Sequence, residues 1–344
     1  MSFKKLIIAL LGIILVVGAL VGYTFYAKIY SANISESTAI YIPTNATFKE
    51  VNTVLNPYLT NKTSFEWVAQ QKNYPNKIKA GKYQIKKGMS NNALIDLLRS
   101  GKQTPVKVSF NNQDTVEKLA GRIAEQIEPD SVAILNAILD TPFLTKHKLN
   151  KANVLGIFIP NSYEFFWNTS ANNFRDRFIV ESDKFWNSNR LEKAKKLNLT
   201  KNEVLTLASI VQKETANISE RPTVAGLYLN RIRNGWPLGA DPTIIFALKQ
   251  KYGQDKVFKR VLNKDLKIDS PYNTYINRGL PPALIAMPDI SSIDAVLNDQ
   301  RHDYFYMCAS VTKLGSHEFA KTLAQHNVNA RKYHQWVSQQ GINR

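Results

Sequence analysis

The chain has 344 residues, 44% hydrophobic and 21% charged, a composition typical of folded protein and sufficient for two or three modest domains. Its formal net charge of +18 favours anionic partners such as nucleic acid, acidic lipid or a wall polymer, although a solvated basic surface has the same composition. The single cysteine, Cys308, excludes an intrachain disulfide, and its apolar strand-like surroundings favour a buried structural thiol. The five histidines lack metal-ligand spacing, so we expect neither a metal nor another cofactor.

The N-terminus carries an uncharged apolar run, residues 6–26, that is long enough to cross a membrane as a helix. Lys4 and Lys5 precede it, so the positive-inside rule places the N-terminus in the cytoplasm and everything after Lys28 outside. A cleaved signal peptide is the alternative, but its core is usually shorter and no clean cleavage site follows. We therefore expect residues 1–28 to form a short cytoplasmic N-terminus and a retained single-pass membrane anchor. The soluble part would be periplasmic or extracellular, which excludes nucleic acid as a partner.

Residues 39–105 indicate a small α+β module. Strands are predicted at 39–43 and 81–85, and helices at 48–59 and 90–101. Ser90 is a typical residue to begin the last helix, and Gly101 a typical residue to end it. Residues 81–101 loosely resemble a LysM-like module, which binds amino-sugar polymers; a plain scaffold domain is the alternative.

Residues 106–150 are interpreted as a linking subdomain, with a strand at 106–110 and helices at 117–127 and near 131–139. A polar, turn-rich segment follows, and we place a domain boundary near residue 150. The aromatic stretch GIFIPNSYEFFW comes next and includes Tyr163. Aromatic faces stack on sugar rings, but such clusters more often pack in a core. Residues 175–197 then predict one long helix.

A capping box at Thr200–Glu203 predicts a helix that starts at about Lys201. Its apolar residues at helical spacing form one face, and Glu214 projects from the edge of that face. A carboxyl group there is desolvated, which raises its pKa, and a raised pKa is what a general acid needs near neutral pH. The alternative is a structural glutamate that forms a salt bridge with Arg221 or Arg231.

The segments after Glu214 predict two further helices and a rigid loop. One helix opens at Ser219–Pro222 and stops at Asn234–Gly235, and another opens with Asp241 as its N-cap. Capping alone accounts for Asp241, so no second catalytic carboxylate is needed. The prolines of residues 271–288 limit that loop, and we expect a strand at 303–310 and a final amphipathic helix near 330–340.

Five segments occur in one order between residues 207 and 327: LASIVQKETA, SERPTVAGLYLNR, ADPTIIFAL, SPYNTYINRGLPPALIAMP and HEFAKTLAQHN. Together they resemble the MltG (YceG-like) family of endolytic murein transglycosylases, and the anchor, the LysM-like module and the aromatic stretch also fit. The catalytic glutamate of the family falls on Glu214. Gln212 stands at the first acidic position of the usual EKE, and Asn161-Ser162 stands where the family usually has Asp-Thr, which leaves the role of that loop open.

The resemblance implies a peptidoglycan lytic endotransglycosylase, a lyase. It would cleave the β-1,4 bond between N-acetylmuramic acid and N-acetylglucosamine within nascent glycan strands, leave 1,6-anhydro ends and so terminate strand elongation. Glu214 would act as general acid and then as base, without a cofactor. The implied location is the bacterial cell (inner) membrane, and the implied partners are peptidoglycan strands, that membrane and peptidoglycan synthases. A hydrolytic muramidase with Glu220 or Asp241 as a second carboxylate, and a non-catalytic wall-binding adaptor, are the alternatives.

Other residues are candidates for substrate binding. Tyr272, Asn273 and Tyr275 offer stacking and hydrogen bonds to sugars, and the remaining candidates, each with a ready structural explanation, are Tyr163, Arg221, Asn230 and His317. The expected fold class is α+β: a transmembrane helix, the LysM-like module, the linking subdomain and a mixed α+β catalytic domain over residues 151–344.

Overall fold

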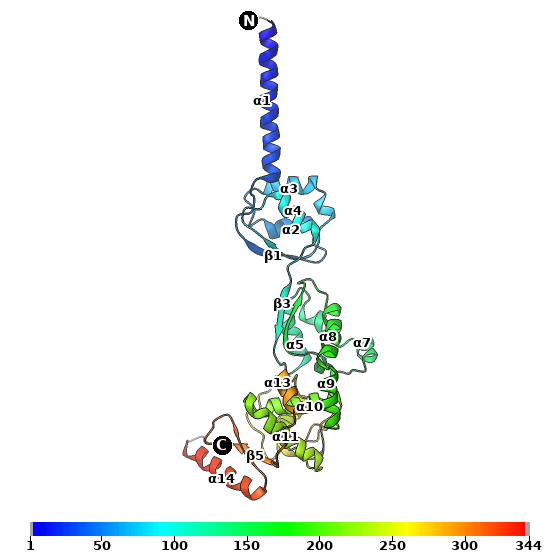
Figure 1. Cartoon of the computed structure of the whole chain (residues 1–344), viewed down its shortest axis with the longest axis vertical. Coiled ribbons are helices and arrows are strands. Elements are labelled where there is room, and N and C mark those ends of the chain that lie inside the picture. The colour runs from blue at the N-terminus through cyan, green and yellow to red at the C-terminus, as the bar shows by residue number, and fades with distance from the viewer. Residues whose placement is uncertain (1–2, 341–344) are drawn as a thin grey trace. The chain divides into compact units, whose positions relative to one another are not determined.

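The computed structural model describes residues 3–340, and these divide into two compact units (Figure 1). Unit 1 contains the residues up to Val108 together with Ala124–Pro129 and Tyr163–Ser170. Unit 2 contains Ser109–Ile123, Asp130–Ser162 and the residues from Ala171 onward. The predicted linking segment, residues 106–150, is therefore divided between the two units.

Unit 1 begins with the apolar helix α1 (Phe3–Tyr30), none of whose residues is buried. By length and composition α1 could cross a membrane. Its last turns pack on the module that follows. The ring centroids of Phe25 and Trp67 lie 5.3 Å apart, and Asn91 donates a side-chain hydrogen bond to the carbonyl oxygen of Lys28 over 2.9 Å.

The module of unit 1 is built on two antiparallel strands, β1 (Thr38–Ile42) and β2 (Gly81–Ile85). Two helices, α2 (Phe48–Leu55) and α3 (Lys62–Gln71), connect them, and α4 (Asn91–Ser100) follows. Alternate strand residues are buried, as expected of a sheet with one face on a core. Both predicted strands and the predicted caps of α4 are confirmed, because the Ser90 side chain accepts from the backbone N–H of Ala93 and Gly101 is left-handed. Helix α3 was not predicted.

The strands β3 (Val106–Phe110) and β4 (Asn161–Phe165) form a second two-stranded sheet. Helices α5 (Val116–Ala124), α6 (Ser131–Ile138) and α7 (Thr141–Lys146) lie between them in the chain. In the aromatic stretch, Phe158 is buried and its ring centroid lies 4.9 Å from that of Phe178. Phe158 is therefore a core residue, in agreement with the packing interpretation.

The predicted long helix at 175–197 is wrong, because the structure has two helices there. Helix α8 (Ala171–Phe185) ends before the buried Trp186, and α9 (Ser188–Lys196) begins after Asn187. The Asn187 side chain accepts a hydrogen bond from the backbone N–H of Arg190, which makes it the N-cap of a new helix.

The core of unit 2 is organised around α10 (Lys201–Glu214), which is buried at every residue from Val204 to Gln212. It packs against α9, α11 (Arg221–Arg233), α12 (Asp241–Tyr252) and α13 (Ile290–Leu297). A hairpin of β5 (Tyr306–Ala309) and β6 (His317–Ala320) and the helix α14 (Leu323–Gln339) complete the unit. Short 3-10 helices occur at Tyr74–Asn76, Val154–Ile157, Ile218–Glu220 and Asp265–Lys267.

Candidate active site

Glu214 is the last residue of α10, and the start of that helix is set by its capping box. Thr200 donates its backbone N–H to a carboxylate oxygen of Glu203 over 2.7 Å, and its hydroxyl oxygen accepts the backbone N–H of Glu203. The helix therefore begins at Lys201, as predicted. It ends after Glu214 because Thr215 is extended, with φ −137° and ψ 132°.

The carboxyl group of Glu214 is partly buried and accepts a 2.6 Å hydrogen bond from the hydroxyl of Tyr228. Burial is the largest influence and raises the pKa of Glu214 from 4.5 to about 7. The negative charge of Asp241 acts in the same direction, whereas the Tyr228 hydrogen bond and the charges of His317 and Arg231 lower this pKa. Near neutral pH the group therefore populates both its protonated and its ionised form.

The salt-bridge interpretation of Glu214 is wrong. Over residues 3–340, Glu214 makes no ion pair, and Arg221 is bound to the carboxylate of Asp289 at 2.6 Å. Arg231 donates instead to the carbonyl oxygen of Phe305, at 2.9 and 2.6 Å from its Nε and Nη2 atoms. A half-buried carboxyl group without a cationic partner is costly in stability alone, so it points to a functional role.

Sequence reasoning missed Tyr228, which lies in the middle of α11 and is 1% exposed. Its neighbours in the segment AGLYL are apolar, so the pattern alone reads as helix core. The available signal was chemical: a buried tyrosine hydroxyl needs a hydrogen-bond partner. Here that partner is Glu214, and burial together with the charge of Glu214 raises the pKa of Tyr228, which keeps its hydroxyl a donor.

The predicted N-cap role of Asp241 is wrong. Ala240 holds the N-cap position without a side-chain cap, and Asp241 is the first helical residue of α12. Its charge is favourable there because of the helix dipole. The carboxylate accepts a 2.6 Å hydrogen bond from the hydroxyl of Tyr275. Because Asp241 raises the pKa of Glu214, a second carboxylate does belong to the electrostatic surroundings of the candidate acid.

The three candidate residues of the 271–288 loop have different positions. Tyr272 is buried, with its ring against another aromatic side chain. Asn273 is fully buried; it donates to the carbonyl oxygens of Leu266 and Ile268, at 2.9 Å each, and accepts from the backbone N–H of Tyr275. These bonds hold the loop together. Of the three, Tyr275 is the one that is 36% exposed, and the charge of Glu214 is one of the influences that raise its pKa.

The buried carboxylate of Glu220 connects the segment after Glu214 to strand β6. It accepts hydrogen bonds from the Thr215 hydroxyl at 3.0 Å and from the backbone N–H of His317 at 2.6 Å. The Nδ1 atom of His317 lies 3.0 Å from the same carboxylate. The structure therefore brings His317 into the surroundings of Glu214, whose pKa it lowers, and occupies the oxygens of Glu220.

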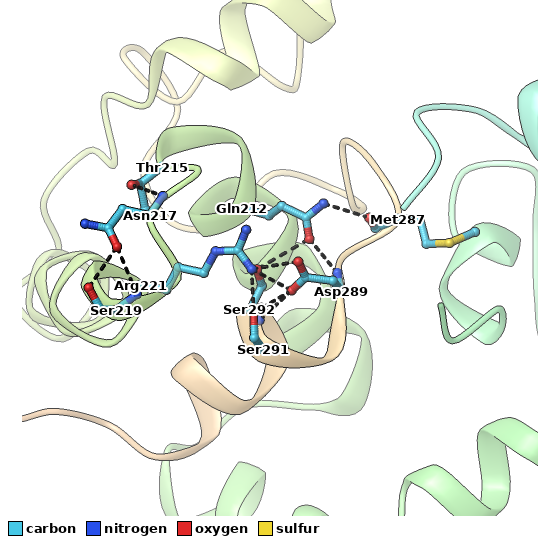
Figure 2. Close-up of polar contacts among 9 residues, drawn as sticks. All are labelled: Gln212, Thr215, Asn217, Ser219, Arg221, Met287, Asp289, Ser291 and Ser292. Carbon is cyan, nitrogen blue, oxygen red and sulfur yellow. Dashed lines mark hydrogen bonds and ion pairs between the residues drawn. The ribbon is translucent and has the colours of Figure 1, made fainter. Parts of the chain in front are cut away.

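Gln212, near the end of α10, and Arg221, at the start of α11, both bind the start of α13 (Figure 2). The side-chain oxygen of Gln212 accepts from the backbone N–H of Asp289, and its amide nitrogen lies 3.5 Å from the carbonyl oxygen of Met287. Arg221 binds Asp289 and the hydroxyl of Ser291. The amide of Gln212 thus joins α10 to the segment before α13, and Arg221 joins α11 to the same segment.

The remaining candidates and Cys308 have surroundings of their own. Asn230 donates its side-chain amide to the carbonyl oxygens of His302, at 2.7 Å, and Tyr304, at 3.1 Å, and so holds that segment. Tyr163 lies in β4 and belongs to unit 1, whereas Glu214 belongs to unit 2. Cys308 lies in β5 as predicted but is only partly buried, and that burial raises the pKa of its thiol.

Comparison with known proteins identifies the family. A model described as the YceG-like family matches residues 40–332. A protein of Bacillus subtilis (strain 168) named endolytic murein transglycosylase is 28% identical over 312 residues, covering 86% of this chain and 84% of that protein. A protein of the same name from Streptococcus pneumoniae (strain D39) is 28% identical over 332 residues, and the match covers 88% of this chain but only 59% of that protein.

A solved structure agrees with this result. The crystal structure of a YceG-like protein from Listeria monocytogenes matches with a TM-score of 0.57 and 26% sequence identity, over 85% of this chain and 98% of that chain. The family match spans both compact units and includes α10 with Glu214. From its sequence motifs, its fold and these matches, the chain belongs to the YceG-like family.

Proposed function

We propose that this protein is a peptidoglycan lytic transglycosylase that cleaves glycan strands internally, with Glu214 as its catalytic residue. The observation that carries the proposal is the carboxyl group of Glu214, which lies at the end of a buried helix with a pKa of about 7 and no cationic partner among residues 3–340. The names of the Bacillus and Streptococcus relatives support the same activity.

The proposed reaction uses this one carboxyl group twice. Protonated Glu214 donates its proton to the oxygen that links C1 of N-acetylmuramic acid to N-acetylglucosamine, and the C1–O bond breaks. The carboxylate then takes the proton of the muramyl C6 hydroxyl while that oxygen bonds to C1. The products are a new N-acetylglucosamine end and a 1,6-anhydro-muramyl end, and no water is consumed. A pKa near 7 suits a group that must first donate and then accept a proton.

The neighbours of Glu214 have supporting roles in this proposal. Tyr228 holds one carboxyl oxygen in place through its 2.6 Å hydrogen bond. The carboxylate of Asp241, oriented by Tyr275, supplies negative charge that would stabilise the positive charge developing at C1. Glu220 is an unsuitable second carboxylate for a muramidase because its oxygens already accept three hydrogen bonds. A hydrolytic reaction with Asp241 as base is the remaining alternative.

The proposal also includes the location of the enzyme. Helix α1, which carries Lys4 and Lys5 in its first turn, would hold the chain in the cell membrane with the residues after Lys28 on the outer side. The two antiparallel strands of unit 1, joined by two helices, support a LysM-like wall-binding role. The net charge of +18 suits an anionic wall. Peptidoglycan synthases are proposed partners because cleavage of nascent strands would occur where they are made.

The test is digestion of purified sacculi by the wild-type chain and by Glu214→Gln. Glutamine keeps the shape of the side chain and can still accept the Tyr228 hydrogen bond, but it cannot donate and recover a proton. We expect the variant to release no soluble muropeptides while remaining folded. Unchanged release by the variant would remove Glu214 from the mechanism.

A further inference from the structure

Two adjoining cavities in unit 2 form a groove along helix α12. The larger has a volume of about 410 Å³ and the smaller about 130 Å³. The two cavities adjoin, because four residues line both: Asp114, Phe246, Gln254 and Ile285. We call this space the α12 groove.

The smaller end of the α12 groove lies beside the last turn of α10. Its smaller end is lined by Lys213, which directly precedes Glu214, and by Pro242, which directly follows Asp241. Its larger end lies between the start of α5, residues 151–155 and the loop segment 284–286. Glu214 and Asp241 are not among the residues that line the groove, so a polymer with its reacting bond at Glu214 would enter it through a substituent and not through its backbone.

The walls of the α12 groove combine apolar, amide and charged groups. Phe246 and Tyr272 present aromatic rings with centroids 4.6 Å apart, and the side-chain amides of Gln250 and Gln254 border the space. Such a lining offers apolar contact together with hydrogen bonds to peptide groups.

The charges of the groove have both signs. Asp114 is already bound by Lys213, at 2.5 Å. Within residues 3–340, Lys151 and Lys249 make no ion pair, and Glu117 also lines the larger cavity without one. The groove therefore presents cationic and anionic groups that are available to a ligand.

We propose that the α12 groove binds the peptide stem that a muramyl residue of peptidoglycan carries next to the bond that is cleaved. This inference rests on the proposed function. A stem-free strand carries only the lactyl carboxylate of each muramyl residue, so it offers neither peptide groups nor an amine to this groove. The free carboxylates of a stem match the lysines, and its peptide groups match the glutamines. The amine of its diamino residue matches Glu117. The enzyme would thus select strands that still carry their stems.

The test is a binding measurement with the full chain in detergent micelles, as its Glu214→Gln variant so that the ligand is not cleaved. The two ligands are a glycan fragment with tetrapeptide stems and the same fragment after an amidase has removed the stems. We expect the stem-bearing fragment to bind about tenfold more tightly. Lys249→Ala should weaken its binding by about two- to fivefold, the effect of a partly exposed ion pair, without changing the binding of the stem-free fragment.

Lys251→Ala is the matched control, because Lys251 lies on the same helix but does not line the groove, and we expect it to change neither affinity. Lys151→Ala tests the larger end independently and should act like Lys249→Ala. Equal affinities for the two fragments, no binding of either, or an equal loss for both in Lys249→Ala would overturn the proposal. Failure of the proposed function is seen separately, as wild-type chain that releases no anhydro products from sacculi.

Discussion

Replacement of Glu214 by glutamine should stabilise the protein, and the gain should depend on pH. The pKa of Glu214 is raised from 4.5 to about 7 in the folded chain. Between these values the folded state retains a proton that the unfolded state has lost, so the wild type loses stability as the pH rises through this window. A shift of about 2.5 units corresponds to about 3 kcal/mol at 1.36 kcal/mol per unit. Glutamine carries no charge, so the variant lacks this loss.

The free energy of unfolding of unit 2 can be followed by urea-dependent pulse proteolysis of the full chain in detergent. We expect wild type and Glu214→Gln to differ little at about pH 4.5, and the variant to be more stable by about 3 kcal/mol at about pH 8. Glu192→Gln, on the exposed surface of α9, is the control. Its free energy of unfolding should differ from that of the wild type by the same small amount at both pH values. An equal difference between wild type and Glu214→Gln at the two pH values would refute the raised pKa.

Four further outcomes follow from the site. Glycan cleavage should fall as the pH rises through about 7, because Glu214 must be protonated to donate; a rate that stays level across this range in a pH profile would contradict its role as acid. Tyr228→Phe removes a hydrogen bond that lowers this pKa, so the fall should move to higher pH in the same assay. Arg221→Met should lower the free energy of unfolding by about 3 kcal/mol, because it leaves the Asp289 carboxylate without its partner. Thr200→Ala should cost about 1 kcal/mol in urea unfolding, through loss of the N-cap of α10.

The local features of the fold could be predicted because they depend on neighbouring residues. The capping box of Thr200 and Glu203 set the start of α10, and the following apolar residues set its course, so the position of Glu214 at the helix end followed from the sequence. The strands β2 and β3 have the predicted bounds for the same reason, because the alternation of buried and exposed residues along a strand can be seen in neighbouring residues of the sequence.

Features that depend on a single competing side chain were harder to predict. Asn187 ends one helical pattern and begins another, but in a polar stretch it looks like an ordinary surface residue. Asp241 next to Pro242 has the pattern of an N-cap, yet helix α12 starts one residue earlier than that pattern implies, and the carboxylate binds Tyr275.

The partners of Glu214 could not be predicted because they come from other elements. Tyr228 lies on α11, Asp241 on α12 and His317 on β6, and nothing in the spacing of these residues specifies that their elements meet. The same holds for Asn273, which the sequence presents as a loop residue available to a ligand and the structure shows as fully buried. The acid was therefore predictable from its helix, whereas the electrostatics that set its pKa required the tertiary structure.

The central claim is that Glu214 drives an intramolecular ring closure without water. The most direct measurement is digestion of purified peptidoglycan by the full chain in heavy-oxygen water, followed by mass spectrometry of the released muropeptides. We predict 1,6-anhydro-muramyl ends that contain no heavy oxygen, and no released products from Glu214→Gln. Reducing muramyl ends that carry one heavy oxygen would show hydrolysis and contradict the mechanism.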